Sequence, residues 1–353
     1  MDVVDTAAEA AALEQPPLVV REPLEQFLDA HGIGAGRVEA ERIGEGHSNI
    51  TFLVRRGEAR VVLRRPPRPP LPPSAHDVLR EARLLRALEG TPVRVPAVLA
   101  VGDDDSVLGV PFYVMEEIHG NVLASAIPAE LDTPAERRRS SEEMVDALVE
   151  LHSVDWAACG LEGYGKPTGY LERQVRRFTG LWEHNKTREL EVVQELGDWL
   201  RDNMPESSEA TIVHGDYRLG NVMMGEGAPA ELVAIFDWEL STIGDPLADV
   251  GYMTVTWVEP DDPQDTMFAQ IGALTRREGF LTRDELIARY EERSGRSMSA
   301  LNWYQALALW KAAVFMEGNY KRFQSGNSDD QYLAAFDRGV PMLADKAWEI
   351  ANA

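Results

Sequence analysis

The sequence of 353 residues predicts an α+β protein with two lobes, a small β-rich N-lobe and a larger, mostly helical C-lobe. Two observations support this prediction. Up to about residue 117, short runs of β-branched and apolar residues alternate with turn-forming glycines, as in strands and hairpins. Beyond Gly120, apolar residues recur at helical spacing in long segments. We therefore place the N-lobe at residues 22–117 and the C-lobe at residues 118–353.

The N-terminal segment, residues 1–21, is rich in alanine and glutamate. Because terminal segments are poorly ordered unless they are tied down, we expect this one to be flexible. A short helix should follow over residues 23–32, where Leu24, Phe27 and Leu28 share one face and Gly32 ends the pattern.

The rest of the N-lobe should consist mainly of strands. Gly44 and Gly57 mark turns between the first three of them. A proline-rich stretch, residues 66–73, is typical of a stiff surface loop. The expected strands are residues 38–43, 50–55, 60–64, 93–101 and 112–116, and one helix covers residues 75–88.

The C-lobe should be helical around a short strand-rich region. Thr282 precedes Asp284 and Glu285, which is a typical helix start. The strand-rich region spans residues 211–237. The expected helices are residues 135–153, 170–184, 189–203, 265–278, 282–294, 299–322 and 332–351.

The charge excludes some classes of partner. The chain has 59 acidic and 35 basic residues, a net charge of −24. Affinity for nucleic acid or an anionic membrane comes mainly from Lys and Arg, so we expect neither partner. A single cysteine, Cys159, permits no intrachain disulfide, and no long apolar run or basic leader is present. We therefore expect a cytoplasmic protein.

The most informative stretch reads I-V-H-G-D-Y-R-L-G-N-V-M from residue 212 to residue 223. Apolar residues flank a compact polar loop that presents Asp216 and Asn221. A second apolar run, residues 232–236, ends at Asp237. Two acids and an amide then converge at strand ends, and Mg²⁺ prefers such oxygen ligands. Phosphoryl transfer needs this set: Asp216 would accept a proton from the acceptor hydroxyl, while Asn221 and Asp237 would hold Mg²⁺.

These motifs, H-G-D-Y-R-L-G-N and I-F-D-W-E, resemble those of aminoglycoside phosphotransferases and choline kinases, relatives of the protein kinases. Together with L-R-R-P-P, G-D-P-L-A-D and Y-E-E-R-S-G-R, they are most similar to the kinase-like domain of some acyl-CoA dehydrogenase family proteins. The resemblance implies a bilobal protein-kinase-like fold, ATP and Mg²⁺ as cofactors, and a small-molecule substrate.

The resemblance also implies an ATP site in the N-lobe. Arg64 stands where kinases have a phosphate-binding lysine, and Glu81 would orient it, unless Glu81 is a solvated helix acid. A loop would cover the phosphates, although a glycine pair between strands is often only a hairpin turn. Met115 would line the adenine pocket or serve as core. The loop residues are Gly44, Gly46, His47, Ser48 and Asn49, and the backbone of Glu116, Glu117 and Ile118 would bind adenine.

Four further residues should support the catalytic loop. The resemblance places His214 behind the loop as structural support, not as a proton carrier. Asp245 and Asp249, from G-D-P-L-A-D, should cap the next helix or brace the loop. Arg218 should contact either a phosphate or acidic substrate, or an internal acid, Asp237 or Glu239.

We therefore expect an ATP- and Mg²⁺-dependent kinase that phosphorylates an alcohol group of a small molecule, such as a hydroxyacyl compound or an aminoglycoside-like alcohol. The alternative is a pseudokinase that holds nucleotide without transfer. A metallophosphoesterase fits less well, because the seven histidines are scattered singly. The sequence does not indicate the oligomeric state.

Overall fold

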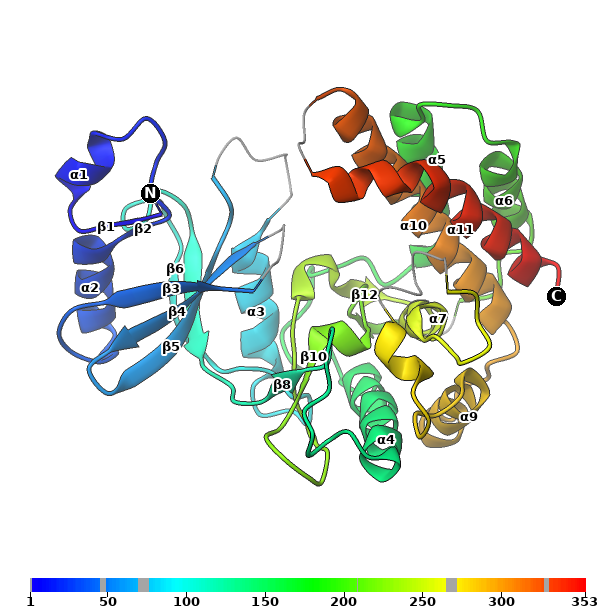
Figure 1. Cartoon of the computed structure of the whole chain (residues 1–353), viewed down its shortest axis with the longest axis horizontal. Helices are drawn as coiled ribbons and strands as arrows, with labels where there is room; N and C mark the ends of the chain where they lie inside the picture. The colour runs from blue at the N-terminus through cyan, green and yellow to red at the C-terminus, as the bar shows by residue number, and fades with distance from the viewer. Residues whose placement is uncertain (1, 45–48, 69–75, 208, 265–271, 327–329) are drawn as a thin grey trace. The chain divides into compact units, whose positions relative to one another are not determined.

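The computed structural model describes residues 2–44, 49–68, 76–207, 209–264, 272–326 and 330–353. The chain forms two compact units, which we call the N-unit, Met1–His119, and the C-unit, Gly120–Ala353. Figure 1 shows the sheet in the first and the helices that dominate the second. Among the described residues, no helix is long and apolar enough to cross a membrane.

A five-stranded antiparallel sheet forms the N-unit, in the order β3-β4-β5-β7-β6. Figure 1 labels β3, β4, β5 and β6 of this sheet. Its apolar residues pack with Leu24 and Leu28 of helix α2 in one buried core. Helix α3 packs against β6 and β7. The elements are β3 (Glu39–Ile43), β4 (Ile50–Arg56), β5 (Ala59–Arg65), β6 (Val98–Gly102), β7 (Phe112–Glu116), α2 (Arg21–Ala30) and α3 (Val78–Leu88).

The N-terminal segment differs from the expectation of a flexible tail. It forms strand β1 (Val3–Val4), helix α1 (Ala7–Ala11) and strand β2 (Val19–Val20), and the two strands pair in parallel. Leu18 and Val19 are fully buried in the N-unit core. The prediction relied on the alanine- and glutamate-rich composition of the whole segment and overlooked this apolar pair. Burial of the pair holds the segment in place.

Long helices surround two small sheets in the C-unit. The sheets are β11-β10-β8 and β12-β9. Helix α10 packs against α5, α6, α7 and α11, and α4 packs against α9. The helices are α4 (Pro134–His152), α5 (Tyr170–Asn185), α6 (Glu191–Asp202), α7 (Leu247–Thr256), α9 (Arg283–Ser294), α10 (Leu301–Gln324) and α11 (Phe336–Ala351), and the strands are β8 (Asn121–Val122), β9 (Thr211–Val213), β10 (Val222–Met224), β11 (Leu232–Ile235) and β12 (Thr242–Gly244).

One expected helix is not found where the structure describes it. Residues 265–271 of the expected helix 265–278 lie outside the described residues, and the remainder contains only a short 3₁₀ helix, η3 (Ala273–Arg276). The other 3₁₀ helices are η1 (Leu219–Asn221), η2 (Trp238–Leu240) and η4 (Gln331–Ala335).

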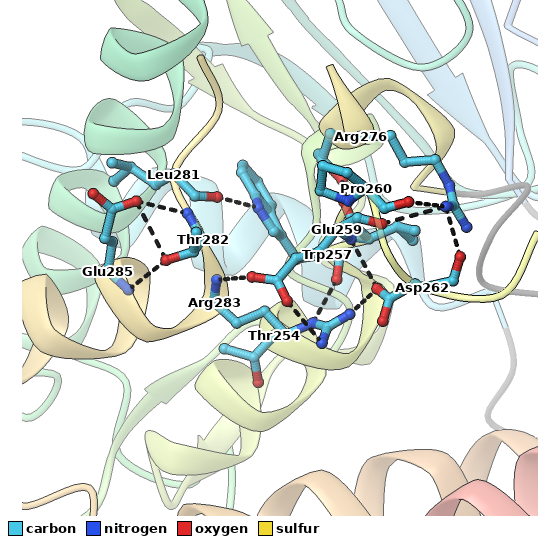
Figure 2. Close-up of polar contacts among 12 residues, drawn as sticks. Thr254, Trp257, Glu259, Pro260, Asp262, Arg276, Leu281, Thr282, Arg283 and Glu285 are labelled. Carbon is cyan, nitrogen blue, oxygen red and sulfur yellow. Dashed lines mark hydrogen bonds and ion pairs between the residues drawn. The ribbon is translucent and has the colours of Figure 1, made fainter. Parts of the chain in front are cut away.

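Arg283 ties the end of α7 to the start of α9 (Figure 2). Its Nε donates to the Trp257 carbonyl at 2.9 Å, and its guanidinium forms ion pairs with Glu259 and Asp262. Thr282 and Glu285 form a capping box at the start of α9, as the sequence predicted for Thr282. These contacts fix α7, which contributes residues to the candidate site.

Candidate active site

The three residues predicted for catalysis and metal binding come from adjoining elements of the C-unit. Asp216 lies in the loop after β9, Asn221 ends η1, and Asp237 follows β11. Val222 pairs with Ile235, and the N–H of Phe236 donates to the Asn221 carbonyl at 2.8 Å. This pairing places Asn221 beside the strand end that presents Asp237.

Asn221 holds the Asp216 side chain directly. Its Nδ2 donates to Asp216 Oδ2 at 2.7 Å and to the Asp216 carbonyl at 2.9 Å. Both amide protons are therefore used, which leaves Oδ1 as the atom of Asn221 suited to ligate a cation. Asp216 and Asn221 thus form one preorganised unit.

Asp237 has a left-handed backbone, with φ 64° and ψ 59°. Such a conformation is uncommon for a residue other than glycine and costs about 1–3 kcal/mol. Strain of this kind gathers at functional sites, because the surrounding structure must stabilise it. The chain turns at Asp237, immediately after the apolar strand β11, so Asp237 does not continue that strand.

Asp249 organises the backbone of the catalytic loop. The N–H groups of His214 and Gly215 donate to its two oxygens at 2.7 and 2.8 Å, and His152 Nε2 lies 3.2 Å away. Burial favours protonated Asp249, but the hydrogen bond and charge of His152 and the N–H of Gly215 outweigh burial, so the pKa of Asp249 lies below its usual value. Tyr290 completes the chain through its hydroxyl, 2.7 Å from His152 Nδ1.

His214 connects the loop to the Asp237 strand. Its Nδ1 accepts the N–H of Asp216 at 3.2 Å, so its Nε2 carries the proton and donates to the Phe236 carbonyl at 2.8 Å. His214 is fully buried. This geometry suits the supporting role that the family resemblance implies.

Gly215 fits where a larger residue would not. Its φ is +87°, and an added Cβ would lie 2.8 Å from the Leu240 carbonyl oxygen. Glycine therefore lets the loop pass close to η2.

Asp245 anchors the start of α7. It accepts hydrogen bonds from Ser207 Oγ at 2.8 Å, from the Tyr304 hydroxyl at 2.9 Å and from the Leu247 N–H at 3.0 Å. Burial and the Asp245 charge raise the pKa of Tyr304, which keeps that hydroxyl a donor. Both Asp245 and Asp249 therefore make the structural contacts expected of them.

Arg218 lies beside the predicted base. Its Nε is 3.6 Å from Asp216 Oδ1, a pairing that we did not predict. Contact of Arg218 with a phosphate or acidic substrate, or with Asp237 or Glu239, stays a prediction.

Tyr252 was missed by the sequence reasoning. It lies three residues after Asp249 on α7, with its hydroxyl near the Asp216 carboxylate; burial, followed by the Asp216 charge, raises the pKa of Tyr252 well above its usual value. It therefore stays a donor. The spacing from Asp249 on one helical face was the available signal.

In the N-unit, the predicted pairing of Arg64 with Glu81 is confirmed. Arg64 Nε donates to Glu81 Oε2 at 2.7 Å, and Glu81 is 2% exposed. Asn49 Nδ2 and the Tyr113 hydroxyl also donate to Glu81, the latter at 3.2 Å. Glu81 is thus a buried hub, and the alternative of a solvated helix acid is wrong.

The other residues predicted to bind ATP have varied surroundings. Asn49 is buried against Glu81 and His76, and Met115 is 6% exposed. Glu117 forms a bidentate ion pair with Arg60, at 2.5 and 2.6 Å. Gly44 follows β3, Glu116 exchanges hydrogen bonds with Ala97, Ile118 is half-buried, and Gly46, His47 and Ser48 lie outside the described residues.

We expect Glu81→Gln to lower the free energy of unfolding by about 3–5 kcal/mol, because it removes the carboxylate charge that pairs with the largely buried Arg64. Urea unfolding would measure this loss. Glu58→Gln, at an exposed site of the same unit, is the matched control and should change stability by less than about 0.5 kcal/mol. Equal effects of the two substitutions would contradict the importance of the hub.

The donor set fits Mg²⁺ in kind. A Mg²⁺ ion usually takes one or two carboxylates together with substrate phosphates and water, and the Asn221 amide oxygen and the Asp237 carboxylate are such donors. Within the described ranges, no group of three or more His, Cys, Asp and Glu side chains is arranged to hold a metal by itself. A site of this kind would depend on phosphates for its remaining ligands.

Comparison with known proteins extends over most of the chain. A model of the phosphotransferase enzyme family matches residues 39–293. Human acyl-CoA dehydrogenase family member 11 is 34% identical over 337 residues, covering 93% of this chain and 43% of the human protein. Mouse acyl-CoA dehydrogenase family member 10 is 32% identical over 330 residues, covering 93% and 30%. The chain spans less than half the length of these curated relatives.

A solved structure agrees with these relatives. A Ralstonia eutropha protein, provisionally named an aminoglycoside phosphotransferase, superposes with a TM-score of 0.81 and is 31% identical, covering 94% of this chain and 98% of that one. The predicted resemblance and the protein-kinase-like fold class are thereby confirmed.

Proposed function

Because the chain belongs to the phosphotransferase enzyme family, we propose that it is an ATP- and Mg²⁺-dependent kinase that phosphorylates a hydroxyl group of a small molecule. The single observation that supports this most directly is the Asp216 carboxylate held by Asn221 at 2.7 Å, next to the strand end at Asp237. A proton acceptor and two oxygen ligands in adjoining positions are what phosphoryl transfer requires.

Each residue would have one task. Asp216 would accept the hydroxyl proton as the oxygen attacks the γ-phosphorus and the bond to ADP breaks. Asn221 and Tyr252 would orient the Asp216 carboxylate, and Asp249 and His214 would hold the loop. Asn221 Oδ1 and Asp237 would hold Mg²⁺, which would neutralise charge developing on the phosphates.

In the N-unit, Arg64 would contact the ATP phosphates. Glu81 would orient the guanidinium through Nε, and Thr51 Oγ1 lies 3.4 Å from its Nη1. Arginine binds phosphate oxygens in a bidentate manner, so it can serve in place of a lysine. The backbone of Glu116 to Ile118 would bind adenine.

A hydroxylated acyl compound is the acceptor class that we favour. The support is the similarity to acyl-CoA dehydrogenase family members over 93% of the chain. An aminoglycoside-like alcohol is the second candidate, favoured by the Ralstonia eutropha structure.

Calorimetric titration with ATP and Mg²⁺, followed by an acceptor screen, tests the proposal. Wild type should bind nucleotide, Asp237→Ala should bind it much more weakly, and at least one hydroxyl compound should be phosphorylated. If the folded protein does not bind nucleotide, the proposal is overturned. Nucleotide binding without transfer to any acceptor would instead indicate a pseudokinase.

Replacing Tyr252 by phenylalanine should lower kcat about tenfold, because the hydroxyl that would help to orient Asp216 toward the acceptor is lost. The KM for ATP should not change, since Tyr252 is not assigned to the nucleotide. Steady-state kinetics would measure both constants. Tyr332→Phe, at an exposed site, is the control; a rise in the KM for ATP with kcat unchanged would contradict the orienting role.

A further inference from the structure

A hollow of about 450 Å³ in the C-unit gathers positive charge, although the whole chain has a net charge of −24. Among the described residues that line it, none is acidic. Lys166, Arg176 and Arg177 are exposed and Arg173 is half-buried. We call this site the α5 hollow; its main side chains are Lys166, Tyr170, Arg173, Gln174, Arg176 and Arg177.

Helix α5 forms one wall of the α5 hollow. Tyr170, Arg173, Gln174 and Arg177 follow the helical spacing that places them on one face of α5. Arg173 donates to the carbonyls of Lys166 and Thr168, which fixes the preceding loop against the helix.

The opposite wall comes from β12. An added Cβ at Gly165 would lie 2.6 Å from the Ile243 nitrogen and 2.7 Å from Thr242 Oγ1. Only glycine lets the loop approach the strand so closely, and Thr242 lines the hollow. The positions of the basic residues therefore follow from backbone packing.

The positive charges lack local compensation. In the part of the chain that the structure describes, none of Lys166, Arg173, Arg176 and Arg177 forms an ion pair with a carboxylate, whereas Arg283 and Arg289 do. The carbonyl partners of Arg173 orient its guanidinium without neutralising it. Burial, together with the nearby charge of Arg177, lowers the pKa of Lys311 to about 8. Unneutralised charge of one sign attracts a ligand of the other sign.

The hollow lies near the catalytic loop. Thr242 pairs with Val213 across the β9-β12 ladder, and Asp216 follows three residues later. Paired residues in antiparallel strands lie about 5 Å apart, and three residues span at most about 10 Å, so Thr242 Cα lies within roughly 15 Å of Asp216 Cα. An extended acceptor could span this distance.

We propose that the α5 hollow binds an anionic group, a phosphate or a carboxylate, of the phosphoryl acceptor, whose hydroxyl reaches Asp216. The inference rests on the proposed kinase function and adds an acceptor class. Arginine forks match the oxygens of either anion. A polycationic aminoglycoside would be repelled by the same side chains, so the hollow favours an acidic alcohol.

The first test measures anion binding without catalysis. Inorganic phosphate is titrated calorimetrically into the full chain, into the Arg176→Gln/Arg177→Gln variant and into a control, Arg322→Gln/Arg338→Gln, which removes the same charge from exposed sites. Phosphate should bind to wild type and to the control with equal affinity, and to the Arg176→Gln/Arg177→Gln variant about tenfold more weakly. Equal affinity in all three proteins would overturn the proposal. Lys166→Gln, on the loop, repeats the test if the double variant does not fold.

The second test separates the sources of the anion. The acceptors compared are hydroxy acids, their neutral amides and hydroxyl compounds with a phosphate. For at least one anionic class, kcat/KM should be about tenfold higher than for its neutral counterpart. The Arg176→Gln/Arg177→Gln variant should lose this preference because its KM for the anionic acceptor rises. Equal use of neutral and anionic acceptors would overturn the proposal while leaving the kinase function standing. Failure of nucleotide binding would instead reject the kinase function, and the phosphate titration would remain informative.

Discussion

The Asp216→Asn variant is expected to lose phosphoryl transfer by about 10²–10⁴-fold in kcat, the usual contribution of a general base. Asparagine keeps the shape of aspartate but cannot accept the hydroxyl proton. Because Asp216 is not assigned to metal or nucleotide, the affinity for ATP and Mg²⁺ should be unchanged. Single-turnover transfer and calorimetric titration would measure the two quantities.

The surroundings of Asp216 make this variant informative. Asn221 Nδ2 donates to Oδ2, and an asparagine at residue 216 could offer its own amide oxygen to that donor. Its NH₂ group would then face Arg218, whose Nε lies 3.6 Å from Oδ1, at a partly exposed position. The fold should therefore persist, with a stability loss of no more than about 1 kcal/mol.

Asp261→Asn is the matched control, because Asp261 is exposed and belongs to no proposed site. It should keep wild-type turnover. If Asp216→Asn kept more than about a third of the wild-type kcat with the chemical step rate-limiting, Asp216 would not be the base. If wild type itself transferred nothing while binding nucleotide, the pseudokinase alternative would hold.

The relation of Asp216, Asn221 and Asp237 was predictable because it is local in sequence. A short strand, a polar loop and a returning strand are joined within about 25 residues, and hairpin pairing brings their ends together. The Arg64 and Glu81 pair was predicted differently, from the resemblance to kinases, which have a phosphate-binding lysine at the position of Arg64 and an acid on the next helix to orient it.

Contacts distant in sequence could not be predicted. His152 reaches Asp249 across 97 residues and Tyr290 across 138. Helical periodicity places these side chains on buried faces but does not say which helix meets them. Tyr252 shares this limit: helix α7 was not among the expected helices, and the approach of Tyr252 to Asp216 depends on how α7 packs.

The burial of the N-terminal segment illustrates a different limit. Composition averaged over residues 1–21 describes a polar tail, but Leu18 and Val19 are fully buried in the core and strand β1 pairs with β2. Asn49, which the resemblance places in the loop over the phosphates, likewise makes a contact that the sequence did not indicate, because its amide donates to the buried Glu81. In both cases one or two burial contacts determine the outcome, and averages over a segment do not record them.

The Asp249→Asn variant is expected to lower the free energy of unfolding by about 3–5 kcal/mol, the usual result of breaking a buried charged contact. The His214 N–H donates to one carboxylate oxygen and the Gly215 N–H to the other. Whichever way the asparagine amide turns, its NH₂ meets one of these backbone donors. A buried N–H then loses its acceptor, and the turn that presents Asp216 is weakened.

Urea unfolding at several pH values would measure this effect and its sign. The pKa of Asp249 is lower in the folded protein than the value of about 3.9 expected in the unfolded chain. Its stabilising contribution is therefore complete above about pH 4 and is lost as the pH falls through the folded value. The stability difference between wild type and Asp249→Asn should stay constant from neutral pH to about pH 4 and narrow only below it.

Tyr290→Phe tests whether the loss comes from the carboxylate or from the whole hydrogen-bonded chain. It removes only the hydroxyl that contacts His152, so it should cost about 1 kcal/mol and leave the Asp249 contacts to the loop intact. A difference that widens toward low pH would show that Asp249 is protonated in the native protein. If Tyr290→Phe lowered the stability as much as Asp249→Asn does, the contact between His152 and Tyr290 would be the main support of the loop. We expect the loss of stability to be much larger in Asp249→Asn than in Tyr290→Phe. In the part of the C-unit that the structure describes, the Asp249 carboxylate alone accepts hydrogen bonds from both backbone N–H groups of the His214-Gly215 turn.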